Sequence, residues 1–169
     1  MPATSETPPP DDAVDRIRRE WSESWPHLNT APIEVLGRIQ RIASISNHRL
    51  DLNLEQLGIT RSEFGVLSAL ARVERPLRAS EVVSTTMLSG ASITKIADTL
   101  VARGLIARQK SERDGRVVLL ALTDAGQSVV ERQMPRRLAD DGALIAGLTS
   151  TEQETLAGLL RKICAALGD

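Results

Sequence analysis

The sequence predicts a mainly α-helical protein that carries one small β-hairpin. Aromatic side chains make up only 2% of the chain, so a core has to be built from Leu, Ile, Val and Ala, which suits packed helices. Apolar residues recur three and four positions apart along most of the chain, which is the spacing of one helix face. The spacing changes to near-alternation only over 105–122, as expected for two short strands.

The N-terminal part predicts a tail and a short helix. Residues 1–10 are rich in Pro, Ser and Thr, and we expect them to be disordered. Asp11 or Asp12 can cap a helix that Pro26 ends. Its apolar stripe consists of Val14, Ile17, Trp21 and Trp25. Because so short a helix is marginal alone, it should dock on another part of the protein.

Helix start and stop signals divide the middle of the chain. A second helix should open at Pro32 and continue to about residue 53. Gly58 is a stop signal, and Thr60 and Glu63 have the spacing of a capping box that opens the next helix. Further short helices are expected over 79–86 and 89–103.

Two strands, over 105–109 and 117–122, should follow, and Asp114-Gly115 between them is a common hairpin-turn dipeptide. Thr123 then opens a long helix to about residue 141, and Thr149 opens a last one.

Composition excludes several classes of protein. The formal net charge is −1, so a basic surface must be local. The single cysteine, Cys164, excludes an intrachain disulfide. There is no apolar run of the ~20 residues that a membrane span requires, and no signal-peptide pattern, so we expect a cytoplasmic protein. His27 and His48 lack partners at metal-ligand spacing. There is also no Cys-His-Asp arrangement, phosphate loop or paired-carboxylate motif. We therefore expect no metal, no cofactor and no enzyme activity.

The order of the central elements indicates DNA binding. A helix, a short helix, a second helix and a charged hairpin form a winged helix-turn-helix, which places its second helix in a major groove. Residues 78–116 hold seven cations and four anions, an excess that fits phosphate contacts. The exposed face of the 89–103 helix should consist of Ser89, Ser92, Thr94, Lys95, Asp98 and Thr99.

The segments 91–106, 113–116 and 122–126 resemble, in order and spacing, the core of the multiple-antibiotic-resistance regulator (MarR) family. The similarity covers about residues 33–167. It implies that Arg116, in the wing, enters a minor groove and that Asp114 helps to hold the wing. The residues expected to contact DNA are Ser89, Ser92, Thr94, Lys95, Thr99, Arg108, Lys110, Arg113, Asp114 and Arg116.

The resemblance also implies a homodimer. Residues 11–57 would form N-terminal helices on the dimerisation and ligand side, 58–122 the DNA-binding lobe, and 123–169 the C-terminal dimerisation helices. A two-fold dimer presents two recognition helices about one DNA turn apart and reads a pseudo-palindromic operator. The fold class we expect is therefore a winged helix-turn-helix with a helical dimerisation lobe.

The segment 15–21 is similar to the extra N-terminal helix of the urate- and trans-aconitate-responsive branch of this family. That similarity implies a ligand pocket lined by Trp21. Gly65 and Ile96 stand where that branch has an aspartate and an arginine, which argues against urate itself. The residues expected on the ligand side are Trp21, Arg49, Phe64 and Arg72.

These observations favour a repressor that a small, perhaps anionic, ligand releases from DNA. An activating or ligand-independent DNA-binding protein of the same fold is one alternative. A winged-helix module that binds another protein is a second.

Overall fold

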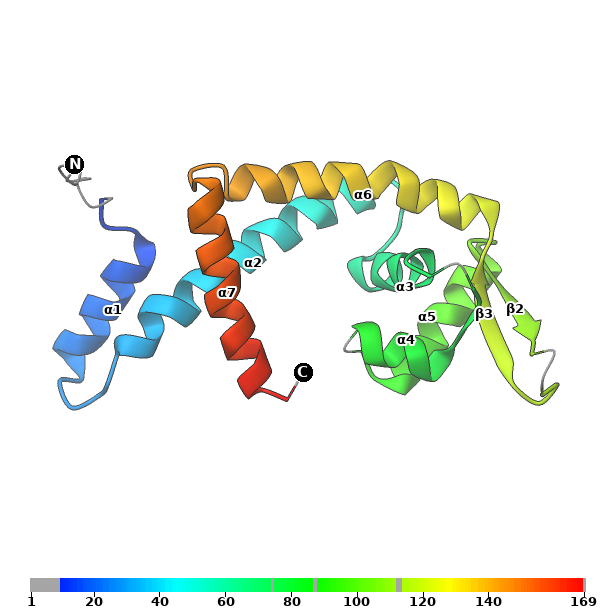
Figure 1. Cartoon of the computed structure of the whole chain (residues 1–169), viewed down its shortest axis with the longest axis horizontal. Helices are drawn as coiled ribbons and strands as arrows, with labels where there is room; N and C mark the ends of the chain where they lie inside the picture. The colour runs from blue at the N-terminus through cyan, green and yellow to red at the C-terminus, as the bar shows by residue number, and fades with distance from the viewer. Residues whose placement is uncertain (1–9, 74, 87, 112–113, 169) are drawn as a thin grey trace. The chain divides into compact units, whose positions relative to one another are not determined.

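The computed structural model describes residues 10–168 except 74, 87, 112 and 113. All but the last residue of the predicted tail therefore lies outside the described part of the chain. Figure 1 shows the order of the helices and strands. The helices are α1 (Ala13–Ser24), α2 (Ala31–Glu55), α3 (Arg61–Ala71), α4 (Ala79–Thr86), α5 (Gly90–Ala102), α6 (Asp124–Leu144) and α7 (Ser150–Ala166). The strands are β1 (Leu77–Arg78), β2 (Ile106–Lys110) and β3 (Val118–Leu122).

The helix boundaries follow from the caps predicted from sequence. The side chain of each N-cap residue accepts a hydrogen bond from a backbone N–H in the first turn, which satisfies a group that the helix itself leaves unpaired. The confirmed caps are Asp12, Thr60, Ser89, Thr123 and Thr149. Three of them form the full capping box with an acidic residue three positions on. Local side-chain chemistry therefore fixes where these helices begin.

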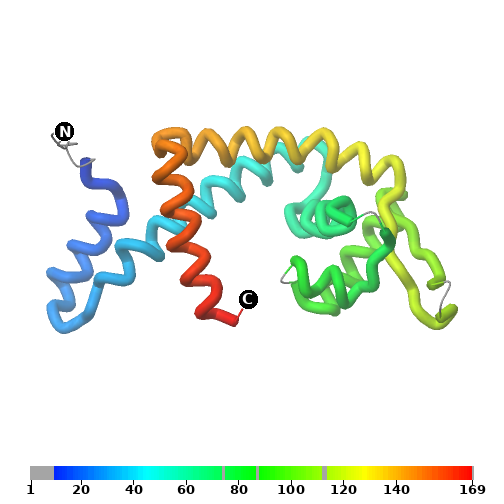
Figure 2. Tube along the Cα trace, viewed as in Figure 1, coloured from blue at the N-terminus to red at the C-terminus, as the bar shows by residue number. Residues whose placement is uncertain are grey.

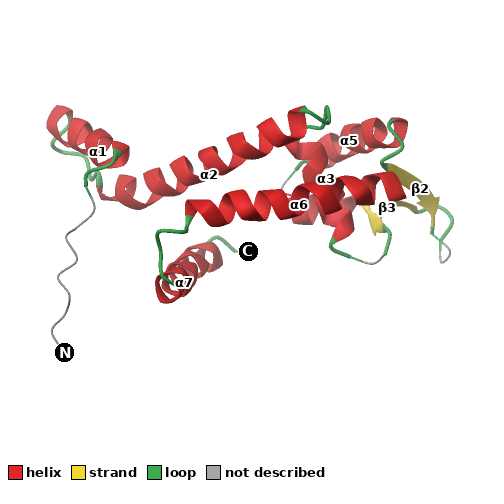
Figure 3. Ribbon diagram, turned by 90° about the horizontal axis from the view of Figure 1, so that it is seen from above, coloured by secondary structure: helices red, strands yellow, loops and turns green. Residues whose placement is uncertain are grey.

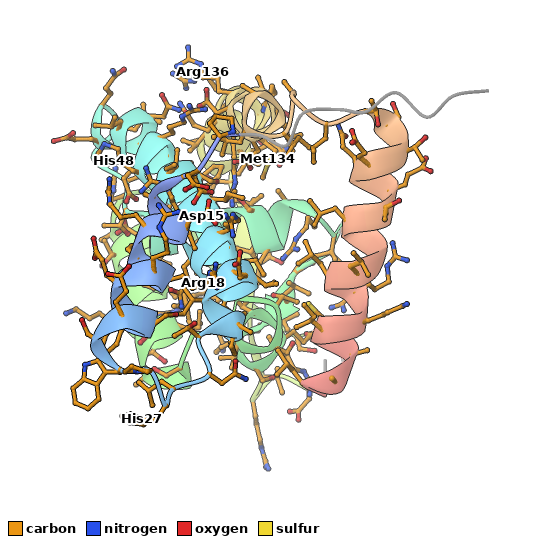
Figure 4. The ribbon with its side chains drawn as sticks, turned by 90° about the vertical axis from the view of Figure 1, so that its left-hand side faces the viewer. Asp15, Arg18, His27, His48, Met134 and Arg136 are labelled. Atoms are coloured by element: carbon orange, nitrogen blue, oxygen red, sulfur yellow. The ribbon has the colours of Figure 1, made fainter. Side chains whose placement is uncertain are left out.

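The chain divides into two compact units, residues 1–45 and 46–169. In the first unit, α1 packs on the N-terminal part of α2. Val14 is 4% exposed, and a Cβ at Gly37 would lie 2.9 Å from its Cγ1 atom, so the glycine permits a close approach. Arg38 forms ion pairs with Asp12 and Asp15 of 2.9 and 2.8 Å. The short helix thus docks as the sequence predicted, and Figure 4 labels Asp15 and Arg18 beside α2.

The second unit holds the main core. Its fully buried side chains include Leu54, Phe64, Leu67, Ile93 and Leu100. They come from the end of α2 and from α3 and α5, so the three helices share one apolar centre. The chain leaves this centre along α6 and turns back into α7 (Figure 2).

A three-stranded antiparallel sheet has the strand order β1-β3-β2. Its strands β2 and β3 lie beside the helices of this unit (Figure 3). The predicted hairpin pairs Ile106 with Leu122 and Lys110 with Val118. The sheet also contains β1, in which Leu77 pairs with Leu120. The sequence analysis did not predict this strand, because its two residues are too few to show a period.

Candidate nucleic-acid interface

Helix α5 presents one apolar face to the core and one polar face to solvent. Ile93, Ala97 and Leu100 are at most 2% exposed and fix the helix against the core formed with α3 and α4. Six predicted surface residues lie on the other side. Ser92 is half-buried. The exposed ones are Ser89, Thr94, Lys95, Asp98 and Thr99. A polar face on a firmly packed helix is what a recognition helix needs.

The hydroxyl groups on this face form hydrogen bonds within the helix and its N-cap. Ser89 and Ser92 share a 2.8 Å hydrogen bond. The hydroxyls of Thr94 and Thr99 donate to the carbonyls four residues earlier, each over 3.1 Å. A hydroxyl that donates to the helix still offers its oxygen outward as an acceptor. These short side chains therefore let a DNA edge approach closely while Lys95 supplies a positive charge.

An ion pair connects the recognition helix to the hairpin. A guanidinium nitrogen of Arg108, on β2, lies 2.5 Å from Oδ1 of Asp98, on α5. Both side chains are more than 40% exposed, so the pair is accessible to solvent and modest in strength. The predicted DNA contact Arg108 is thus already held in place by the helix beside it.

The tip of the hairpin is a tight turn made by Asp114. Its carbonyl accepts from the N–H of Val117 over 2.9 Å, and its Oδ1 accepts from the N–H of Arg116 over 3.0 Å. The turn occurs where the sequence predicted it. Gly115 is not among the described glycines with positive φ, so the geometry is not the two-residue turn that Asp-Gly often forms. The side chain of Asp114 holds the backbone of Arg116 instead.

Arg116 and Lys110 are exposed on this hairpin. The tip therefore offers cations that can reach a DNA backbone or minor groove. Arg113, predicted to contact DNA as well, lies outside the described residues.

The residues predicted on the ligand side are distributed over both units. In the first unit, Trp21 lines a cavity of about 500 Å³ between α1 and α2. The second unit contains the other three. The Arg49 guanidinium donates to the Asp140 carbonyl over 3.2 Å, Phe64 is fully buried in the core, and Arg72 is exposed.

The cavity of the first unit also contains polar residues that the sequence analysis missed. Gln40, Arg41 and Ser44 line it together with apolar side chains. Ile33, Gly37 and Arg41 follow one another at intervals of four residues, which places them on one helix face. This spacing was the signal in the sequence that could have predicted Arg41 in the wall of the cavity.

The described residues contain neither a metal-binding cluster nor a membrane-spanning helix. Within the described ranges there is no group of three or more His, Cys, Asp or Glu side chains that could hold a metal ion. Among the described helices, none is long and apolar enough to cross a membrane. Cys164 is exposed and free.

Several known proteins are similar to this chain in sequence and in fold. A family model described as the MarR family matches residues 57–117, from the turn after α2 to the turn of the hairpin. The multiple antibiotic resistance protein MarR of Escherichia coli is 32% identical over 134 residues, which is 76% of this chain and 90% of that protein. The chain belongs to the MarR family. It is therefore a DNA-binding transcriptional regulator, and α5 and the hairpin are the recognition helix and wing of a winged helix-turn-helix.

Other relatives and solved structures match over more of the chain. The regulator PecS of Dickeya dadantii is 25% identical over 152 residues, 89% of this chain and 92% of PecS. A structure of Bordetella bronchiseptica BpsR, whose DNA binding is regulated by 6-hydroxynicotinic acid, is 26% identical with a TM-score of 0.67. It covers 77% of this chain and 92% of its own. AbsC of Streptomyces coelicolor shares the fold at 22% identity, with a TM-score of 0.73 and coverage of 83% and 97%.

Proposed function

We propose that this MarR-family protein is a homodimeric repressor that binds a pseudo-palindromic operator through α5 and the wing. The observation that carries the proposal is the pairing of a polar recognition helix with a cationic hairpin in one packed unit. Lys95, Lys110 and Arg116 are exposed on these two elements. The proposed contacts also include the remaining predicted residues, Ser89, Ser92, Thr94, Thr99, Arg108, Arg113 and Asp114.

Unpaired apolar surface supports the homodimer. No residue of α7, which is described throughout, is buried. Its exposed apolar side chains are Leu156, Leu159, Ile163 and, at the C-cap, Leu167, with exposed fractions of 40–75%. A helix that exposes such a stripe is typical of an interface that a second copy covers. The interface brings two recognition helices to one operator.

The cavity of the first unit supports release by a small anion. Its wall combines Trp21 and other apolar side chains with the cation of Arg41, which suits a ring that carries a carboxylate. The DNA binding of BpsR is regulated by a molecule of this kind. We propose that Trp21 and Arg41 contact the ligand in the first unit. Ligand contacts by Arg49, Arg72 and the fully buried Phe64, which belong to the second unit, stay predictions. The ligand acts only through its different affinities for the two states of the dimer.

Fluorescence anisotropy with the DNA upstream of the protein's own gene tests the DNA proposal, and light scattering tests the dimer. Adding 6-hydroxynicotinate to the complex tests release by an aromatic carboxylate. Operator binding that no tested carboxylate alters supports a ligand-independent regulator. Transcription that rises with binding identifies an activator. Failure to bind any DNA more tightly than unrelated duplex, together with capture of a protein partner, would support the interaction module.

A further inference from the structure

The end of α2 is a Schellman turn whose last carbonyls have no partner within the helix. The Ile59 N–H donates to the Leu54 carbonyl over 3.2 Å, and the Gly58 N–H donates to the Glu55 carbonyl over 2.9 Å. Gly58 has a φ of 59°, the left-handed conformation this turn requires. The Leu57 carbonyl lies at the negative end of the helix dipole, and the Gly58 carbonyl follows it directly in the chain.

Arg103 binds these two carbonyls. Its guanidinium donates to the Gly58 carbonyl over 2.7 Å and to the Leu57 carbonyl over 3.0 Å. The same guanidinium lies 3.8 Å from the carboxylate of Glu63, whose side chain is only 10% exposed. Glu63 in turn accepts from the backbone N–H of Thr60. One arginine thereby joins the end of α2 to the start of α3.

Arg103 is itself the C-cap residue of the recognition helix. Helix α5 ends in a second Schellman turn, in which the Leu105 N–H donates to the Leu100 carbonyl and the Gly104 N–H to the Val101 carbonyl, each over 2.9 Å. Gly104 has a φ of 68°. The side chain of Arg103, at the end of α5, thus caps the end of α2. Helix α5 is thereby fixed to α2 about one turn away from the DNA-facing residues of α5.

The turn at the end of α5 is also fixed to α6. The Thr123 hydroxyl donates to the Gly104 carbonyl over 2.7 Å, and the Thr123 N–H donates to the Leu105 carbonyl over 3.2 Å. A Cβ at Gly126 would lie 2.0 Å from the Leu105 carbonyl oxygen, so helix and turn are in direct backbone contact.

Helices α2 and α6 are joined in turn at the far end of α6. Ser46 and Asn53 of α2 donate to Asp141 and Asp140 over 2.5 and 3.0 Å. The contacts form a closed ring from α2 through α5 and α6 back to α2. The direction of α5 is therefore set by the two long helices.

We propose that Arg103 is a positioning residue for operator recognition, which holds the recognition helix at a fixed angle on the end of α2 without touching DNA. This inference rests on the proposed role of α5 in operator binding. Both terminal nitrogens of its guanidinium donate to carbonyls, and its charge lies 3.8 Å from the Glu63 carboxylate, so we assign it to holding the helix rather than to a phosphate. Because a dimer binds both half-sites at once, an error in the angle of α5 should weaken operator binding and leave non-specific binding intact.

The test compares Arg103→Ala and Arg103→Lys with the wild type on the upstream DNA and on an unrelated duplex of equal length. We expect both variants to lose operator affinity by at least about tenfold, because the single ammonium of a lysine lacks the planar fork with which the guanidinium donates to the two carbonyls. Affinity for the unrelated duplex should stay within about twofold, with an unchanged salt slope. Arg132→Ala, which removes an exposed cation of α6, is the matched control and should bind both DNAs like the wild type.

Two results would overturn the assignment. If both affinities fall together, the salt slope decreases by about one and Arg103→Lys restores binding, Arg103 is a phosphate contact. If Arg103→Ala lowers only the unfolding temperature and leaves operator affinity unchanged, the arginine serves stability alone.

A measurement without DNA separates this inference from the proposed function. In a Cys164→Ser background, a spin label on Ala91→Cys, an exposed position of α5, reports the distance between the two recognition helices of a dimer. We expect Arg103→Ala to broaden that distance distribution. An unchanged distribution would contradict the positioning role, even if the upstream DNA contains no operator.

Discussion

The Asp98 carboxylate and the Arg108 guanidinium lie 2.5 Å apart and connect the recognition helix to the wing. Asp98 is the single acidic residue of α5, on the face that we propose to approach phosphates. The pair therefore neutralises a repulsive charge and orients β2 at the same time. An exposed ion pair contributes little to folding stability, so its main effect should be on DNA binding.

We expect Asp98→Ala and Arg108→Ala each to lower operator affinity, and the double variant to be no weaker than Arg108→Ala alone. The reason is that both single changes release the same anchor of the wing, so their effects are not independent. Anisotropy titrations of the four proteins give the coupling energy directly. Additive losses, or a gain in affinity from Asp98→Ala, would show that the pair does not act as a unit.

Arg116, at the wing tip, allows a direct test of DNA contact by the hairpin. Arg116→Ala should reduce operator affinity by about tenfold or more, because an arginine in a narrow minor groove gains from enhanced negative potential. Light scattering should show an intact dimer, since the side chain is exposed and remote from the core. Wild-type affinity in this variant would remove the wing from the interface.

Because α6 touches the turn at the end of α5, one methyl group added at Gly126 should have a large effect on the free energy of unfolding. Gly126→Ala should lower the free energy of unfolding by about 2 kcal/mol or more, because its Cβ would overlap the Leu105 carbonyl oxygen. Gly142→Ala is the matched control in the same helix, where a Cβ has no neighbour within 4 Å. It should be neutral or stabilising. Equal effects of the two changes in urea denaturation would contradict the packing described above.

The docking of α1 should depend on pH. Hydrogen bonds from Arg38 and from the backbone of Asp12 hold the pKa of Asp15 below its ordinary value of 3.8. A lowered pKa means that the contact stabilises docking above the ordinary carboxyl range and is lost as the pH falls through the lowered value. Trp21 and Trp25 of α1 are the only tryptophans of the chain, so their emission reports docking.

We expect the emission of the wild type to shift to the red below about pH 4. In Asp15→Asn it should be shifted already at neutral pH and change less on acidification. Glu23→Gln, a carboxylate of α1 outside the Arg38 cluster, should follow the wild type. Identical curves for wild type and Asp15→Asn would mean that this ion pair does not hold α1.

Local signals in the sequence predicted most of the elements, since caps such as Thr60 and Ser89 act within one turn. The same holds for Gly104, whose left-handed conformation ends α5. What the sequence did not show depends on residues distant in the chain. Strand β1 exists only because Leu77 pairs with Leu120, and the partner of Arg103 lies 45 residues away. No spacing rule connects such positions, so the sequence identified Arg103 only as one cation among seven.

The most direct test of the central claim is a salt series of anisotropy titrations with the DNA upstream of the protein's own gene, in the presence of excess unrelated DNA. We predict tight binding that survives the competitor and weakens steeply with salt, because a dimer neutralises several phosphates. Binding no tighter than to the unrelated DNA, with little dependence on salt, would contradict operator recognition through α5 and the wing.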